Sequence, residues 1–172
     1  AHGYLLGEFL SPLWNKREDE FGGDAKGRFE IVKLIAEGIK SSIPSSFPLF
    51  IKINGSDIEK GGVTIQEAVK TAKLAEKAGF DCIEVSSGSG RKPYSLMGDI
   101  DYDFIFKNPK TREKMRKRFD DIHFKPTFNL EFAREIKRNV NVPIACVGGF
   151  RNVDEMVNAI KNKDCDVISL CR

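Results

Sequence analysis

The stretch Pro143-Ile-Ala-Cys-Val-Gly-Gly-Phe-Arg-Asn152 places an apolar run directly before two glycines and the start of a helical pattern. The run is apolar at successive positions, which is typical of a strand buried on both faces of a parallel sheet. Asn152 suits the N-cap of the helix, with Glu155 in the reciprocal capping position. The apolar positions of that helix are Val153, Met156, Val157 and Ile160. The stretch therefore predicts a strand, a tight turn and a helix.

The same alternation of strand and helix runs along the rest of the chain. The predicted strands are the apolar runs Leu49–Ile53, Cys82–Ser86, Pro143–Val147 and Val167–Cys171. Amphipathic patterns predict helices between them: one over about 29–40, one that starts at Thr64 and stops at Gly79, and one behind Asn129 as N-cap. Regular alternation implies parallel strands joined by right-handed crossovers, so the predicted fold class is α/β.

Two α/β architectures fit this order, an open doubly wound sheet and a (β/α)8 barrel. The turn Gly148-Gly149 does not match the G-x-G-x-x-G dinucleotide pattern, which disfavours the doubly wound alternative. A whole barrel takes about 250 residues, so four strands in 172 residues amount to roughly half of one. The chain also stops flush against an apolar run, and we interpret residues 1–172 as one partial domain truncated at both ends.

Composition disfavours several classes of function. The 28 basic and 25 acidic side chains leave a net charge of +3, too small and too evenly mixed to indicate a nucleic-acid or membrane partner. No apolar run approaches the roughly 20 residues that span a bilayer, and no signal-peptide pattern opens the chain. The four cysteines form no C-x-x-C pair and only two histidines exist, so we expect buried thiols, no metal site and a cytoplasmic protein.

A segment over about Gly90–Thr127 interrupts the alternation. It mixes basic side chains with acidic ones on both flanks. The simple interpretation is a solvated helix or loop. The alternative is a lid over a ligand, because the segment follows the carboxyl end of a predicted strand.

Ligands of parallel α/β proteins bind where the strands end, which directs attention to the loops after each strand. Gly148 and Gly149 stand between a strand and a helix N-terminus, where backbone N–H groups approach an anion and the helix dipole favours it. Tight turn geometry alone also explains two glycines at this place.

Three further side chains are candidates for chemistry. His2 and Tyr4 are one residue apart, so in an extended segment both would face one pocket, where an imidazole can bind a substrate oxygen and a phenol can donate a proton. Packing on the surface or in the core is the alternative. Lys52 lies inside an apolar strand and requires a ligand or an anionic partner, for which Glu84 on the neighbouring strand is the candidate.

The opening stretch Ala1-His-Gly-Tyr-Leu-Leu-Gly-Glu-Phe-Leu-Ser-Pro-Leu-Trp-Asn-Lys-Arg-Glu-Asp-Glu-Phe-Gly-Gly23 resembles a family signature almost end to end. The signature is A-H-G-Y-L-L-x-x-F-L-S-P-x-x-N-x-R-x-D-x-[YF]-G-G, of the FMN-dependent Old Yellow Enzyme group of NADH:flavin oxidoreductases. This group includes 2,4-dienoyl-CoA reductase-like members. The stretches Ile51–Asp57, Val147–Arg151 and Asp166–Arg172 agree with the group in the same order.

The resemblance implies a TIM barrel with FMN at its C-terminal face, to which this chain contributes the end of the fourth strand through the eighth. It implies that NADH or NADPH reduces FMN and that reduced FMN passes hydride to an activated alkene, a small-molecule substrate. His2 matches a residue that holds the substrate carbonyl oxygen, and Tyr4 matches the proton donor. Lys52 matches a cation near the N1–C2 edge of the flavin.

The resemblance also implies an FMN phosphate site at Gly148, Gly149, Cys171 and Arg172. Two departures from the family pattern stand out. The loop that starts at Asp24 keeps only Arg28 of the usual S-x-E-N-R, and Cys171 stands where glycine is commoner.

Two alternatives to a flavin enzyme remain at this point. One is a half-barrel that acts as a non-catalytic interaction module, and the other is a phosphate-binding barrel isomerase or lyase, which leaves the opening signature unexplained. Four parallel strands without closure expose two sheet edges, so we also expect a homo-oligomer.

Overall fold

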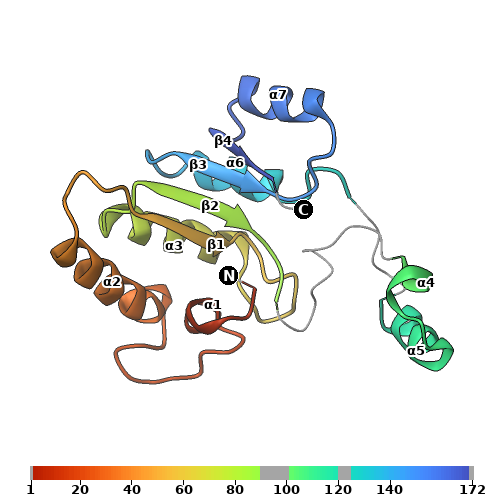
Figure 1. The fold of residues 1–172 in the computed structure, drawn as a ribbon. Coiled ribbons are helices and arrows are strands. Elements are labelled where there is room, and N and C mark those ends of the chain that lie inside the picture. Colours follow the sequence, from red (N-terminus) through yellow and green to blue (C-terminus); the bar gives the residue numbers. More distant parts are fainter. Residues whose placement is uncertain (1, 90–100, 120–124, 171–172) are drawn as a thin grey trace.

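The structure is a computed structural model of the chain, and it describes residues 2–89, 101–119 and 125–170 (Figure 1). Its centre is a four-stranded parallel sheet in the order β1-β2-β3-β4. The strands are β1 (Phe50–Asn54), β2 (Cys82–Ser86), β3 (Ile144–Val147) and β4 (Val167–Ser169). The predicted α/β class is confirmed, and each observed strand lies within one residue of a predicted run at its start. Cys171, at the end of the fourth predicted strand, lies outside the described residues.

The helices that the alternation predicts are α2 (Ala25–Ser42), which precedes β1, and α3 (Ile65–Lys77), α6 (Leu130–Lys137) and α7 (Val153–Lys161), which follow strands. A further short helix, α1 (Leu5–Leu10), precedes α2. Helix α3 contacts β1, and α6 contacts β2 and β3, so these two helices cover the same side of the sheet (Figure 1). The arrangement is that of a partial α/β barrel wall, with the helices outside.

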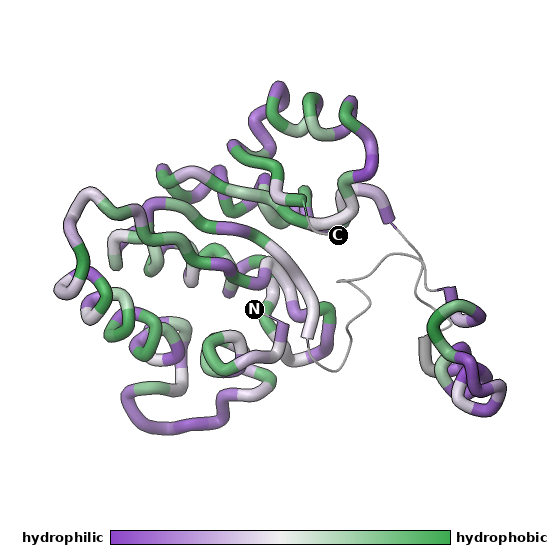
Figure 2. The backbone as a smooth tube through the Cα atoms, viewed as in Figure 1, coloured by the Kyte–Doolittle hydropathy of each residue, from purple (hydrophilic) through white to green (hydrophobic). Residues whose placement is uncertain are grey.

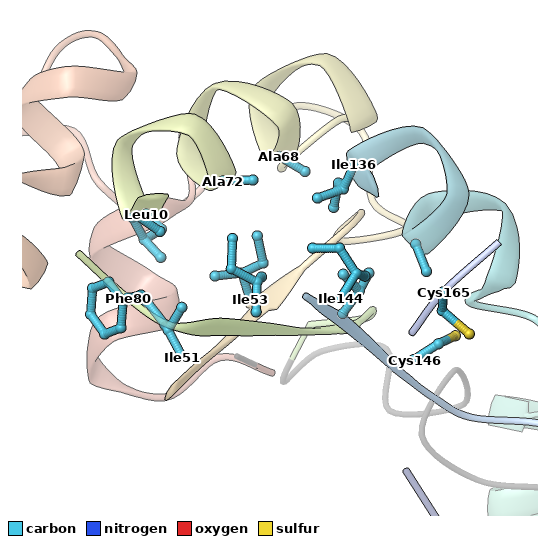
Figure 3. Packing of buried hydrophobic residues seen from close by; sticks show 14 of the residues in the cluster. Leu10, Ile51, Ile53, Ala68, Ala72, Phe80, Ile136, Ile144, Cys146 and Cys165 are labelled. Atoms are coloured by element: carbon cyan, nitrogen blue, oxygen red, sulfur yellow. The ribbon is translucent and has the colours of Figure 1, made fainter. Parts of the chain in front are cut away.

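The hydrophobic core lies between the sheet and these helices (Figure 3). Ile53 and Ile144 reach it from the strands, and Ile136 reaches it from α6. Helix α3 contributes the fully buried Ala68 and Ala72, whose small side chains let the helix approach the strands closely. Burying each isoleucine side chain contributes about 1.5–3 kcal/mol.

On the opposite face of the sheet, the residues of β1 are less buried than the sequence predicts. Continuous apolar runs predict burial on both faces, and β3 is buried at every position. In β1, however, Ile51 and Ile53 are buried while Phe50 and Lys52 are exposed. The alternation arises because successive side chains point to opposite faces and, within the described residues, helices cover only one of them.

The predicted helix boundaries near α3 are confirmed. The Thr64 hydroxyl accepts a hydrogen bond from the Glu67 backbone N–H, as an N-cap does. Gly79 follows the helix with φ of 78°, the left-handed conformation that ends helices.

The capping predictions near the third and fourth strands are correct only in part. Asn152 caps α7 by accepting from Asp154 N–H at 2.7 Å. Glu155 does not complete a capping box, since its Oε2 is buried without a partner among the described residues. Asn129 stands at the N-cap of α6 as predicted, but its side chain makes no cap hydrogen bond, and its amide Nδ2 donates to Val147 O at 2.6 Å.

The prediction that His2 and Tyr4 face one pocket assumed an extended opening segment, and the segment is not extended. His2 and Gly3 have positive φ angles of 66° and 76° and form a turn, after which α1 begins. Helix α1 was not predicted. Helix α2 starts earlier than expected, at Ala25, because Asp24 accepts a hydrogen bond from Gly27 N–H and caps it.

The described part of the insert contains two helices, α4 (Tyr102–Ile105) and α5 (Pro109–Phe119). Asp103 binds both Arg112 and Arg116, at 2.9 and 2.8 Å. Figure 2 shows α5 mostly in hydrophilic colours, which fits the solvated-helix interpretation. The lid interpretation stays a prediction, and residues 90–100 and 120–124 of that segment lie outside the described residues. Among the helices of the described ranges, none has the length and apolarity to cross a membrane.

Candidate active site

His2 lies at the carboxyl ends of the first two strands. Its ring Nε2 is 2.6 Å from the hydroxyl oxygen of Ser86, the last residue of β2. Its backbone N–H donates to Asn54 Oδ1 at 3.4 Å. Asn54 ends β1 and pairs in register with Ser86, so both contacts lie at the same edge of the sheet. The structure therefore brings one predicted site residue to the edge where ligands of parallel sheets bind.

The environment of His2 keeps its imidazole neutral. Burial, the largest cause, lowers the pKa of His2 to about 4; the positive charges of the N-terminal amine and of Lys52 act in the same direction, and Glu84 opposes them. A neutral imidazole carries one N–H donor and one acceptor nitrogen. When the Ser86 hydroxyl donates to Nε2, the ring proton stays on Nδ1, which then offers its N–H to a ligand.

Tyr4 lies two residues beyond His2, in the N-cap position of α1. Its carbonyl accepts from Glu8 N–H at 2.8 Å, which fixes the backbone at the start of the helix. Its side chain is 76% exposed, so the phenol is open to solvent and accessible to a ligand. The structure places Tyr4 close to His2 along the chain and shows no contact that fixes the direction of its ring.

Lys52 and Glu84 form the ion pair that the sequence indicated. They are partners in the β1–β2 register, and 2.7 Å separates Lys52 Nζ from Glu84 Oε2. The Lys52 side chain is 41% exposed, on the face of the sheet opposite the core. The cation is therefore not trapped in the core, and it remains accessible from the open face.

The turn Gly148-Gly149 requires glycine for reasons of conformation and space. The φ angles of Gly148 and Gly149 are 113° and 79°, which residues with a side chain rarely adopt. A Cβ on Gly148 would lie 2.6 Å from the Phe128 ring, and one on Gly149 would lie 2.5 Å from the backbone nitrogen of Thr127. These constraints explain the glycines without a ligand, so the phosphate role stays a prediction. Cys171 and Arg172 lie outside the described residues.

A buried polar network beside His2 was not predicted from the sequence. Asp57 accepts hydrogen bonds from the Ser11 hydroxyl at 2.6 Å, Asn54 Nδ2 at 2.8 Å and Val63 N–H at 2.8 Å. Ser11 lies in the opening signature and Asp57 in the loop after the first predicted strand. An acidic residue in the loop after a buried strand is the signal that points to such a network, but its partner Ser11 is 46 residues away in sequence.

Arg28 anchors the opening loop although the motif around it departs from the family pattern. The side chain is buried and forms an ion pair with Glu67 of α3. It also donates to Leu10 O at 3.1 Å and to Gly23 O. One planar guanidinium therefore joins α1, the loop and α3, a task that suits its fixed fork of donors.

Three of the cysteines are buried thiols, as predicted. Burial raises the pKa of Cys82 and Cys146 above the ordinary range and raises that of Cys165 to about 11. Thiols with such pKa values stay protonated at neutral pH and are poor nucleophiles. They belong to the core and not to the candidate site.

A family model described as the NADH:flavin oxidoreductase / NADH oxidase family matches residues 1–172. The chain belongs to this family. It is 33% identical over its whole length to the NADH-dependent flavin oxidoreductase iccE of Talaromyces variabilis and covers 38% of that protein. It is 30% identical to an NADPH dehydrogenase of Geobacillus sp. (strain WCH70) and covers 42% of it. The chain thus spans about two fifths of these relatives.

Solved structures support the same assignment. A 2-naphthoyl-CoA reductase in complex with 2-naphthoyl-CoA matches the whole chain with a TM-score of 0.79 and 25% identity, and the chain covers 23% of it. An Old Yellow Enzyme homologue of Zymomonas mobilis matches 96% of the chain with a TM-score of 0.62, and the chain covers 39% of that protein. At 18% identity the second match shows the fold alone. The resemblance read from the opening signature is confirmed, and the isomerase or lyase alternative is disfavoured.

Proposed function

We propose that this chain forms the second part of an FMN-dependent oxidoreductase that passes reducing equivalents from NADH or NADPH to an activated alkene. In this proposal β1 to β4 are the fifth to eighth strands of a TIM barrel. The observation that carries it is the position of the His2 ring, whose Nε2 lies 2.6 Å from Ser86 Oγ at the carboxyl edge of the sheet, where burial and the charge of Lys52 lower its pKa.

The residues present fit an anionic flavin cofactor. Lys52 offers an ammonium group on the open face of the sheet, where it is accessible beside its partner Glu84. The turn Gly148-Gly149 leads into the N-terminus of α7, whose dipole favours a phosphate group. We assign the flavin edge to Lys52 and the phosphate to this turn together with Cys171 and Arg172. When bound, FMN supplies a two-electron carrier between the nicotinamide and the alkene.

His2 is the residue that we assign to the substrate carbonyl. Burial lowers the pKa of His2, which favours the neutral imidazole at neutral pH. Its Nδ1–H, kept in place when Ser86 donates to Nε2, then donates to the carbonyl oxygen and draws electron density from the conjugated alkene. This polarisation makes the β-carbon more electrophilic and orients the substrate.

Tyr4 is the residue that we assign to proton donation. Its exposed phenol lies two residues from His2, and a phenol can give its proton to the α-carbon while His2 holds the carbonyl oxygen. Two neighbouring residues of the opening segment then bind the substrate carbonyl and donate the proton.

The experiment uses the full-length enzyme with FMN and follows NADH or NADPH oxidation with 2-cyclohexenone as substrate. We expect a bound flavin spectrum and enone-dependent turnover. Ser86→Ala removes the hydroxyl that fixes the His2 ring, and we expect the KM for the enone to rise roughly tenfold, the loss of about one hydrogen bond. Ser46→Ala, on an exposed loop, is the matched control. A wild-type protein that binds no flavin would refute the proposed function.

A further inference from the structure

We propose that Asp57 is a positioning residue for His2, which acts by fixing the side-chain amide of Asn54. The inference deepens the proposed function and rests on it where His2 is assigned to the substrate. No contact joins Asp57 to His2 directly in the structure; the connection runs through Asn54.

The carboxylate of Asp57 has a fully determined orientation. The residue is 2% exposed. Its Oδ2 accepts from the Ser11 hydroxyl at 2.6 Å and from Val63 N–H at 2.8 Å, and its Oδ1 accepts from Asn54 Nδ2 at 2.8 Å. Three donors from three separate segments therefore hold both oxygens, so the carboxylate is a rigid point of reference at the end of β1.

This carboxylate decides which way the Asn54 amide faces. The NH₂ group has two hydrogens, and it donates to Asp57 Oδ1 at 2.8 Å and to Gly88 O at 2.7 Å. A flipped amide would turn its carbonyl oxygen toward these two acceptors, which is unfavourable. Asn54 Oδ1 is consequently directed at the backbone N–H of His2, 3.4 Å away.

His2 needs such a tether because its backbone conformation is strained. It has φ of 66°, a left-handed conformation that costs a residue with a side chain about 1–3 kcal/mol unless its surroundings hold it. Asn54 holds the backbone and Ser86 holds the ring. If the Asn54 amide is released, the backbone can relax and the imidazole leaves its partly buried place beside Ser86.

A purely structural role is the competing explanation, because Asp57 also closes its own loop. Its N–H donates to Val63 O, and Gly62 packs against its side chain. Asn54→Ala separates the two roles, since it removes the link to His2 but leaves the bonds of Asp57 to Ser11 and Val63 in place. Asp57→Asn tests the carboxylate, because the new NH₂ group must face a donor at either oxygen position.

The deciding measurement is the pKa of the His2 ring, by NMR titration of the full-length protein labelled with ¹⁵N-histidine and assigned with His2→Asn. Burial lowers the pKa of His2, and we expect it to rise toward 6.5 in both Asn54→Ala and Asp57→Asn as the ring leaves its partly buried place. Ile136→Val, in the core beside α3, lowers stability without touching the network and leaves the His2 pKa unchanged. The KM for 2-cyclohexenone rises in both variants, while the rate of flavin reduction by NADH or NADPH stays within twofold.

An unchanged His2 pKa and an unchanged enone KM in folded Asn54→Ala would overturn the inference, and this variant decides alone if Asp57→Asn does not fold. The failure of the proposed function is distinguishable. If the wild-type enzyme binds no flavin but the His2 pKa still rises in the variants, the positioning role stands and the assigned chemistry is wrong.

Discussion

Lys52 and Glu84 meet on the open face of the sheet, with 2.7 Å between the ammonium nitrogen and the nearer carboxylate oxygen. The two charges act on His2 in opposite directions, Lys52 lowering its pKa and Glu84 raising it. The pair therefore provides a nearly balanced charge beside the candidate substrate residue. In the proposed enzyme the cation lies beside an anionic flavin, and Glu84, its register partner on the same face, offsets part of its charge.

Replacing Glu84 by glutamine tests this balance. Glu84→Gln leaves the Lys52 charge uncompensated, so we expect FMN to bind several-fold more tightly and Lys52→Met to weaken binding. The pair is partly exposed, so its loss costs at most about 1 kcal/mol of stability. FMN fluorescence titration measures the affinity. Glu113→Gln, which removes an exposed pair with Lys117 on α5, is the control and leaves the affinity unchanged. Weaker FMN binding by Glu84→Gln would show that Glu84 positions Lys52 rather than offsetting its charge.

Replacing Tyr4 by phenylalanine tests the proton donor. Tyr4→Phe removes one hydroxyl from an exposed ring, so the fold is unaffected. We expect alkene reduction to slow by about 10²–10⁴, the usual contribution of general acid catalysis. Flavin reduction by NADH or NADPH keeps its rate, because no proton from Tyr4 is needed there. Stopped-flow measurement of the two half-reactions checks this, with Tyr102→Phe on α4 as control. Equal slowing of both half-reactions would contradict the assigned role.

The sequence predicts those parts of this molecule that depend on local pattern. Apolar runs locate the four strands of the sheet, and those of β1, β2 and β3 are apolar because these strands pack against α3 and α6. The Thr64 cap is predicted for the same reason, since the hydroxyl and the Glu67 N–H that it accepts from are three residues apart. Such features are specified by neighbours in sequence.

Features that depend on distant partners are not predictable in this way. Asn129 takes its predicted N-cap position, but its side chain makes no cap hydrogen bond and donates instead to Val147, which is 18 residues away. The opening stretch does not predict the turn at His2, because the groups that hold it are Asn54 and Ser86, which are distant in sequence. His2 and Lys52 are candidates from the sequence pattern, and Glu84 is predicted there as the partner of Lys52; the family resemblance adds their roles, and the structure adds the supports of His2.

The lowered pKa of His2 makes stability depend on pH. In the unfolded chain the imidazole has its ordinary pKa of about 6.5, against about 4 in the folded protein. Between these values the unfolded state binds a proton that the folded state does not, so the free energy of unfolding falls as pH decreases from about 6.5 to about 4. The side chain is only half-buried, and solvent screening limits the loss to on the order of 1 kcal/mol.

Urea unfolding between pH 7 and pH 4 measures this dependence. His2→Asn removes the titrating group and should lose the corresponding part of the slope. Carboxylates such as Asp24 and Asp166, whose pKa values are lowered, also titrate at the acid end, and the difference between the two proteins cancels them. Identical slopes for both proteins would mean that the His2 pKa is close to 6.5 in the folded state.

The turn at Gly149 offers a test of the candidate phosphate site against its structural explanation. Gly149→Ala places a methyl group in a left-handed conformation and 2.5 Å from the backbone nitrogen of Thr127, which cannot move aside as a flexible side chain does. The conformation alone costs about 1–2 kcal/mol and the contact adds about 1–3 kcal/mol. We expect a loss of a few kcal/mol in urea unfolding and a strong loss of FMN affinity.

Gly38→Ala is the matched control, because it makes the same substitution inside α2 where a Cβ meets nothing within 4 Å. It should raise stability by about 0.5–1 kcal/mol and leave FMN binding unchanged, since alanine is the better helix former. A second comparison separates stability from binding. Dilute urea lowers the stability of the wild-type protein to that of Gly149→Ala, and the FMN affinity measured there shows how much affinity is lost through stability alone. An affinity loss no greater than that would mean that the glycines shape the turn and do not contact the phosphate.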